Sequence, residues 1–168
     1  MIQLIIIIIS FILDGILTNF LPYMLNDLSL FTPLLTVTSI FLIYPFYKKN
    51  ERKYYLTLLI LGIIYDLFYT NLLFLNAIVF LLLGIVSSYI HKNFELSYLK
   101  LIIYIILIIT IYELTTVIVI GIFNLVPLTP SKIIYKITHS LLLNIIYAEL
   151  IYLVIKLIPI RYKKISIN

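Results

Sequence analysis

The sequence contains no cysteine and no tryptophan, and it has only 4 glycines in 168 residues. Without cysteine, the chain forms neither a disulfide nor a thiolate metal site. The glycines are not clustered, so there is no glycine-rich loop of the kind that cradles phosphate groups. The motifs Gly-x-Ser-x-Gly and His-Glu-x-x-His are also missing. We therefore expect no catalytic residue, no cofactor and no bound metal, and we predict that the protein is not an enzyme.

Charge is scarce as well. Charged residues make up 11% of the chain, whereas a soluble domain carries about a quarter, and hydrophobic residues make up 64%. Such a chain cannot cover a globule with polar surface, so lipid must be its solvent. The net charge of +5 comes from basic residues in short connections between apolar runs, which is a membrane-topology pattern and not one of nucleic-acid binding. The sequence predicts one all-α integral membrane domain over residues 1–168.

Six apolar runs have the length of transmembrane helices. They cover residues 2–21, 31–47, 54–69, 72–90, 101–123 and 137–158. The third and fourth come from one stretch that is too long for a single span, so we divide it at its polar cluster, residues 69–71. Pro33 is expected near the start of the second helix, where a missing N–H is harmless. Pro127 and Pro130 predict that residues 124–136 do not continue a neighbouring helix, with a short amphipathic turn over 132–137.

The basic residues predict the orientation. With the N-terminus inside, ten Lys and Arg residues lie on the inner side and only Lys132 and Lys136 lie on the outer side. This is a clear positive-inside bias, so both termini are expected in the cytoplasm. Tyrosines mark many of the predicted span ends and are expected to form the aromatic belt of a membrane protein, at positions Tyr23, Tyr44, Tyr47, Tyr54, Tyr55, Tyr69, Tyr89 and Tyr98.

Four acidic residues lie inside the apolar runs: Asp14, Asp66, Glu113 and Glu149. A carboxylate at the bilayer centre costs roughly 2.5–3.5 kcal/mol on insertion scales. Asp14 and Asp66 are expected in the outer half of the bilayer, and Glu113 and Glu149 near mid-depth. The simplest interpretation is that each acid hydrogen-bonds to a Ser, Thr, Asn or Tyr side chain of a neighbouring helix. A second hypothesis is that the acids form a shared polar site that binds a partner's helix or a small ligand. A third is that they form a proton relay.

Two further positions belong with these acids. Gly62 precedes Asp66 by four residues, so both lie on one helix face, where glycine allows a neighbouring backbone to approach closely. Asn144 lies on the sixth span with Glu149, but the two need not share a face.

His91 and His139 fall on opposite sides of the membrane, and neither has a second ligand at metal-binding spacing.

The hairpin between the third and fourth spans carries a family resemblance. Residues 61–73 read LGIIYDLFYTNLL. This stretch resembles the signature of the rod shape-determining MreD family, a Gly-x-x-x-Asp pattern entering a short hairpin and followed by a leucine-rich span. Comparable groups in the family correspond to the acid of the first span (Asp14), Pro33, Glu113 and Asn144. Asn71 and Phe74 stand where the family usually has glycines.

The resemblance implies a non-enzymatic subunit of the bacterial elongation complex in the cytoplasmic membrane, which helps to organise peptidoglycan synthesis and cell shape. Its implied partners are the MreC-like single-pass scaffold protein, the MreB-like filament and the wall-synthesis polymerase and transpeptidase. Gly62, Asp66 and Glu113 would carry or support the partner surface. Asp66→Leu is then expected to weaken partner capture while the protein still accumulates.

The resemblance also implies the fold of energy-coupling-factor transporter substrate-binding subunits, and such a subunit, which binds a vitamin, is the alternative function. Those subunits dock through an Ala-x-x-x-Ala pattern in their first helix, and the first span here has no alanine. A small proton-coupled transporter is the third candidate. It would need a polar path across the membrane, whereas the acids here cluster at mid-depth and outward.

Overall fold

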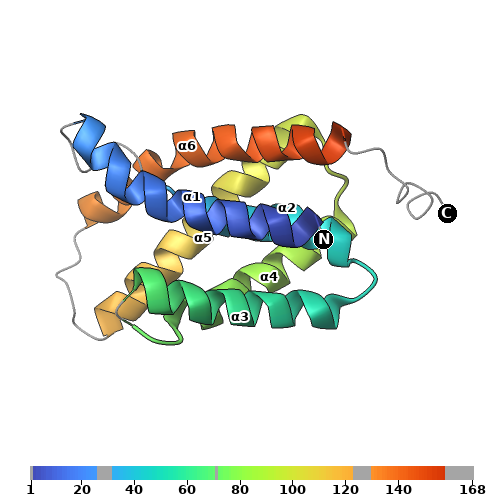
Figure 1. The fold of residues 1–168 in the computed structure, drawn as a ribbon, viewed down its shortest axis with the longest axis horizontal. Helices are drawn as coiled ribbons and strands as arrows, with labels where there is room; N and C mark the ends of the chain where they lie inside the picture. The colour runs from blue at the N-terminus through green and yellow to red at the C-terminus, as the bar shows by residue number, and fades with distance from the viewer. Residues whose placement is uncertain (1, 26–31, 71, 123–129, 158–168) are drawn as a thin grey trace.

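The computed structural model describes residues 2–25, 32–70, 72–122 and 130–157, and within these residues the chain is helical apart from its short connections. The helices are α1 (Ile2–Leu25), α2 (Leu35–Tyr47), α3 (Glu51–Tyr69), α4 (Leu75–Asn93), α5 (Tyr98–Ile122) and α6 (Pro130–Leu157), shown in Figure 1. The six helices expected from the sequence are therefore present in the described part of the chain.

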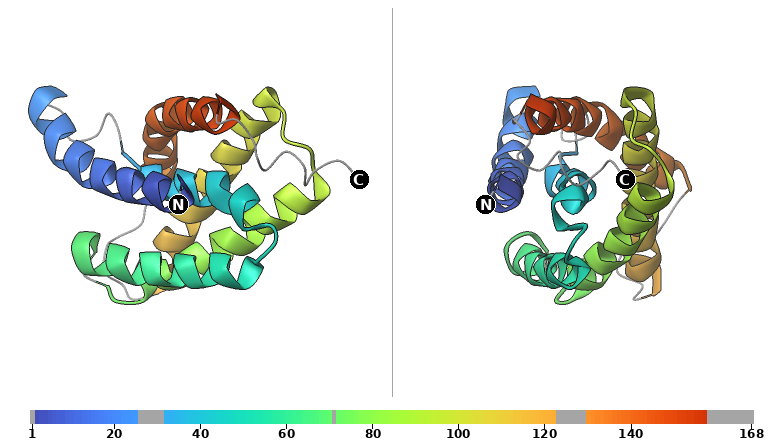
Figure 2. Two further views of the ribbon diagram at one scale, coloured as in Figure 1. Left: turned by 45° about the vertical axis from the view of Figure 1, so that its right-hand side comes forward. Right: turned by 90° about the vertical axis from the view of Figure 1, so that its right-hand side faces the viewer.

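Helix α2 is the centre of the molecule. It packs against each of the five other helices, and the right-hand view of Figure 2 shows it in the middle of the ring that they form. All of its residues from Leu35 to Tyr44 are buried. A helix that is buried around its whole circumference must be apolar on every face, and this one is nearly so. The closest pairing of the other helices is α3 with α4 and α5 with α6, so the chain consists of three consecutive helical hairpins around one axis.

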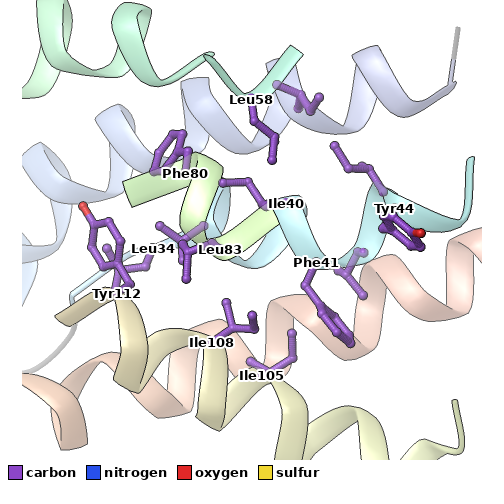
Figure 3. Close-up of a cluster of buried hydrophobic side chains, with 14 of the residues drawn as sticks. Leu34, Ile40, Phe41, Tyr44, Leu58, Phe80, Leu83, Ile105, Ile108 and Tyr112 are labelled. Carbon is purple, nitrogen blue, oxygen red and sulfur yellow. The ribbon is translucent and has the colours of Figure 1, made fainter. Parts of the chain in front are cut away.

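The core lies between α2, α4 and α5. Figure 3 shows Ile40 of α2 beside Phe80 and Leu83 of α4, whereas Phe41 of α2 lies on the side of Ile105 and Ile108 of α5. In contrast, large apolar side chains on the outer faces are exposed, among them Ile8, Leu67, Phe68, Ile103 and Ile118. Apolar surface pointing outward from every side fits a protein whose solvent is lipid.

Four helices are long and apolar enough to cross a membrane: α1, α4, α5 and α6. Helix α3 begins with three charged residues, Glu51, Arg52 and Lys53, which shorten its apolar part. Helix α2 has 13 residues, which rise about 20 Å at 1.5 Å each, less than the ~30 Å hydrocarbon core. The second apolar run is thus helical only from Leu35. Pro33 lies before the helix, and it disfavours helical conformation in Thr32, the residue that precedes it.

The sequence prediction for residues 130–137 is wrong. Helix α6 begins at Pro130 and continues without a break, so the expected amphipathic turn is its first two turns, and Lys136 lies inside the helix. Proline is tolerated at the first helical position because its missing N–H has no intrahelical partner there. The remainder of the expected loop, residues 124–129, lies outside the described residues.

The aromatic-belt prediction fails for three tyrosines. Tyr44, Tyr47 and Tyr54 are buried against one another, and Tyr54 donates its hydroxyl to the Ile40 carbonyl oxygen at 2.9 Å. Tyrosine can be buried in this way when its hydroxyl finds a partner. Tyr69, Tyr89 and Tyr98 are exposed as expected, Tyr55 is partly buried, and the side chain of Tyr23 lies outside the described ones.

Candidate functional site

Asp14 of α1 caps the beginning of α2. Its carboxylate is buried and accepts hydrogen bonds from the backbone N–H of Leu35 at 2.7 Å and of Thr36 at 2.8 Å. These N–H groups belong to the first turn of α2 and have no intrahelical acceptor. The residue at the N-cap position, Leu34, has no side chain that could accept them. The carboxylate of one helix therefore supplies the cap of the next, and it also complements the positive end of the helix dipole.

Asn144 of α6 holds the segment that enters α2. Its Oδ1 accepts from the Leu34 N–H at 2.9 Å, and its Nδ2 donates to the Thr32 carbonyl oxygen at 3.0 Å. Asn144 is fully buried, and its amide also bonds to the Ser140 carbonyl of its own helix. Asp14 and Asn144 thus approach the start of α2 from two different helices and bond three consecutive backbone N–H groups.

Asp66 of α3 does for α4 what Asp14 does for α2. Its carboxylate accepts from the backbone N–H of Asn76 at 3.0 Å, from the Asn76 amide at 2.8 Å and from the Ala77 N–H at 3.3 Å. A fourth donor is the Thr70 hydroxyl at 2.8 Å, in the link that follows α3. The Tyr112 hydroxyl of α5 donates to Asn76 Oδ1 at 3.0 Å, so this network joins three helices.

Gly62 lets α3 and α4 come close enough for this network. A Cβ at position 62 would lie 2.6 Å from the backbone nitrogen of Ala77 and 2.7 Å from the Asn76 carbonyl oxygen. Real Cβ atoms do not approach backbone atoms so closely, so no larger residue fits without moving the helices apart. This is the close backbone approach that the Gly62–Asp66 spacing predicts.

Glu113 of α5 has a different partner. Its side chain is 1% exposed, and its Oε2 lies 3.1 Å from the Nζ of Lys136 on α6, whose side chain is 49% exposed. Neither carboxylate oxygen of Glu113 makes a hydrogen bond of good geometry within the described structure. The pair is therefore held by charge attraction. Since Lys136 is in a segment that the sequence analysis placed outside the sixth helix, this partner was not predicted.

The three hairpins therefore share one arrangement. In each of them an acid of the first helix contacts the second helix near its beginning. The sequence shows no matching residues around these acids, so this repetition exists only in three dimensions. Tyr112, which precedes Glu113 on α5, is buried and reaches the Asp66 network through Asn76.

Glu149 does not join this group. It lies half-buried on α6 and interacts with Tyr98, the first residue of α5, toward the opposite end of the bundle. The sequence analysis started the sixth helix seven residues too late, and the depth that it gave Glu149 stays a prediction. Of the six predicted site residues, Asp14 and Asn144 meet at the start of α2, and Gly62 and Asp66 meet the start of α4. Glu113 contacts Lys136 and is not joined to either group.

The sequence analysis missed Asn76, Thr70 and Tyr112, which complete the network around Asp66. Asn76 lies in the first turn after the hairpin, where Asn is a frequent partner of backbone groups, and this was the available signal. His91 packs on the rings of Phe41 and Tyr44, and His139 stacks on Tyr135. The described residues contain no group of His, Cys, Asp and Glu side chains that could hold a metal ion.

Comparison with known proteins gives one match. Residues 1–159 match the family model described as rod shape-determining protein MreD. No curated protein matches the chain. No solved structure matches it either, so the expected likeness to energy-coupling-factor subunits stays a prediction. The family match covers nearly the whole chain, and the apolar helices make it a multi-pass membrane protein. The chain belongs to the MreD family of rod shape-determining membrane proteins.

Proposed function

We propose that this chain is a non-enzymatic membrane subunit of the bacterial elongation complex, and that it binds an MreC-like single-pass scaffold protein in the cytoplasmic membrane. Through that scaffold it would be connected to the MreB-like filament and to the enzymes of peptidoglycan synthesis. The family match supports this role. The orientation that we propose, with both termini in the cytoplasm, follows from the distribution of Lys and Arg.

The observation that favours a scaffold is the use of the buried acids. Asp14 and Asp66 accept from first-turn backbone N–H groups of α2 and α4 that have no intrahelical partner, so they fix where these helices begin and how they pack. A membrane protein that serves as a fixed surface for partners needs such rigidity, because helix packing in lipid gains little from the hydrophobic effect.

The same observation counts against a substrate-binding transporter subunit. Transporters often use the N-termini of short helices inside the membrane to bind anionic groups of their substrates. Here the chain's own carboxylates occupy the N-termini of α2 and α4. A proton relay is disfavoured as well, since Asp14, Asp66 and Glu113 each contact the beginning of a different helix and not one another.

The test is an affinity pull-down of the tagged chain from its native membranes in mild detergent, with partners identified by mass spectrometry. We expect the MreC-like protein and wall-synthesis enzymes to be recovered. An unrelated tagged multi-pass protein from the same cells is the control for carry-over of abundant membrane proteins. Recovery of transporter ATPase subunits with their coupling protein would reject the proposal in favour of the transporter alternative.

A further inference from the structure

Glu113 differs from the other buried acids in what satisfies its carboxylate. Asp14 accepts two backbone N–H groups, and Asp66 accepts four donors. Glu113 is equally buried, yet neither of its oxygens has a hydrogen-bond donor in the described structure, and Lys136 contributes only its charge. A carboxylate is an acceptor-only group, so a buried one with empty acceptor positions lacks donors that a complete site would provide.

The depth of Glu113 limits where such a donor can come from. Helix α5 has 25 residues, and Glu113 is three residues past its middle residue, Thr110. At 1.5 Å per residue this is about 5 Å from the bilayer centre if the helix is centred, whereas the hydrocarbon edge is about 15 Å away. Lipid headgroups do not reach this depth, and the hydrocarbon core holds no water. A transmembrane helix packed against α5 and α6 can carry a donor side chain to this depth.

The site is close to the lipid-facing surface. The face of α5 that carries Glu113 is buried, with Ile109 and Val117, whereas the adjoining face with Leu114 and Ile118 is exposed. Among the described residues, Lys136 is the cation in contact with Glu113, and its long side chain is half-exposed and can move aside. A helix packed along this side of α5 and α6 would meet the lysine first and the carboxylate behind it.

We propose that Glu113, covered by Lys136, is the polar contact point for the transmembrane helix of a partner protein. That helix brings a hydroxyl, amide or cationic side chain at mid-depth, which donates to the free oxygen of Glu113. This inference rests on the proposed function, because it assigns to one residue pair the contact with the single-pass partner. It also assigns Asp14 and Asp66 to internal capping and removes them from the contact surface.

The test replaces both members of the pair in the full-length chain, E113L/K136L. Exchange of a buried ion pair for well-packed apolar residues is often neutral or stabilising, so we expect this variant to accumulate and to melt no lower than the original chain. Recovery of the co-expressed MreC-like protein, at equal bait, is expected to fall about 3- to 20-fold, the range that interhelical hydrogen bonds give in membranes.

A matched control changes the other ion pair of the described structure, in which Lys92 Nζ lies 2.6 Å from Glu51 Oε1. E51Q/K92M is expected to leave recovery of the partner unchanged. If E113L/K136L fails to accumulate, the charge-exchanged variant E113K/K136E takes its place. It keeps an internal ion pair but offers the partner a cation in place of an acceptor, so recovery should fall as well.

The outcomes separate the inference from the proposed function. Unchanged recovery with an accumulating E113L/K136L or E113K/K136E variant would overturn the contact point while leaving the proposed function intact. If the original chain itself recovers no single-pass wall protein, the proposed function fails, and the contact point fails with it. Loss of recovery in the Glu113 variants, with full recovery in E51Q/K92M, would support both.

Discussion

Single residues decide how the polar backbone groups of this protein are satisfied in lipid. The helices α2 and α4 begin with Leu34 and Phe74 at their N-cap positions, and neither side chain accepts a hydrogen bond. In water the free N–H groups would bond to solvent, but in a bilayer each unsatisfied group is costly. Asp14 and Asp66 supply the acceptors from neighbouring helices, which explains why acids are retained at positions where lipid makes them expensive.

The capping role predicts a stability effect at Asp66. Asp66→Leu leaves three donors without an acceptor, the N–H groups of Asn76 and Ala77 and the Asn76 amide, whereas the Thr70 hydroxyl keeps two backbone carbonyl oxygens. Each unsatisfied donor costs about 1–3 kcal/mol when buried, so we expect a loss of at least about 3 kcal/mol and poor accumulation. Asp66→Asn keeps one acceptor oxygen and should lose about 1–2 kcal/mol. Thermal unfolding of the purified protein in detergent measures both. Glu149→Leu, at the half-buried acid outside the network, is the control and should change stability by less than about 0.5 kcal/mol.

This expectation replaces the one drawn from the sequence, in which Asp66→Leu lost its partner but still accumulated. A Leu variant that accumulates and melts like the original chain would show that the cap contributes little, and Asp66 would then return as a candidate for the partner surface.

At the scale of helices, the link between α3 and α4 contains a strained residue. Phe74 has φ of 67°, in the left-handed region that favours glycine, and it is the non-glycine residue with positive φ in the described chain. It is also one of the two positions at which the resemblance to the MreD family led us to expect glycine. The strain persists because Asn76 and Ala77 must present their N–H groups to Asp66 immediately after the turn.

Phe74→Gly is therefore expected to stabilise the protein. A left-handed conformation costs an L-residue about 1–2 kcal/mol, and the substitution removes this cost. Glycine also loses more conformational entropy on folding, which offsets part of the stabilisation, so we expect a net increase in stability of up to about 1 kcal/mol. The matched control is Phe94→Gly at the other end of α4, where φ is −131° and glycine has no conformational advantage. Both phenylalanines are exposed. Denaturation midpoints that fall equally in the two variants would contradict strain at Phe74.

At the scale of the whole molecule, one short buried helix organises five longer ones. Because α2 is shorter than the hydrocarbon core, it cannot be an independent span, and its beginning is fixed within the bundle by α1 and α6. The outer helices present apolar side chains to lipid on every side, so polar contacts such as Glu113 with Lys136 are the features that distinguish one side from another.

The absence of cysteine makes the proposed orientation directly testable. Single cysteines at Lys49 and Glu95 should react with a membrane-impermeant maleimide only after the membrane is permeabilised, since both positions lie on the side that the basic residues assign to the cytoplasm. Cysteines at Leu73 and Ser131 should react in intact spheroplasts. The reverse labelling pattern would place both termini outside and would contradict the positive-inside assignment.

Much of the fold follows from hydropathy alone. The six helices, the division of residues 54–90 into a hairpin and the close approach at Gly62 are all readable from the chain, because apolar length and residue size are local properties. The partners of the acids are not readable in this way. Asp14 bonds backbone N–H groups 21 and 22 residues away, and these become free only because α2 begins at Leu35 and not at residue 31.

The sequence by itself determined that the chain is a helical membrane protein of the MreD family and that its acids are exceptional, since composition and motif spacing carry that information. Only the tertiary structure decided what each acid does. Asp14 and Asp66 cap the starts of α2 and α4, and Glu113 forms an ion pair with Lys136. Glu149 takes part in none of these contacts. The physical reason is that hydrogen bonds form between atoms that are close in space, and helix beginnings and packing set those distances.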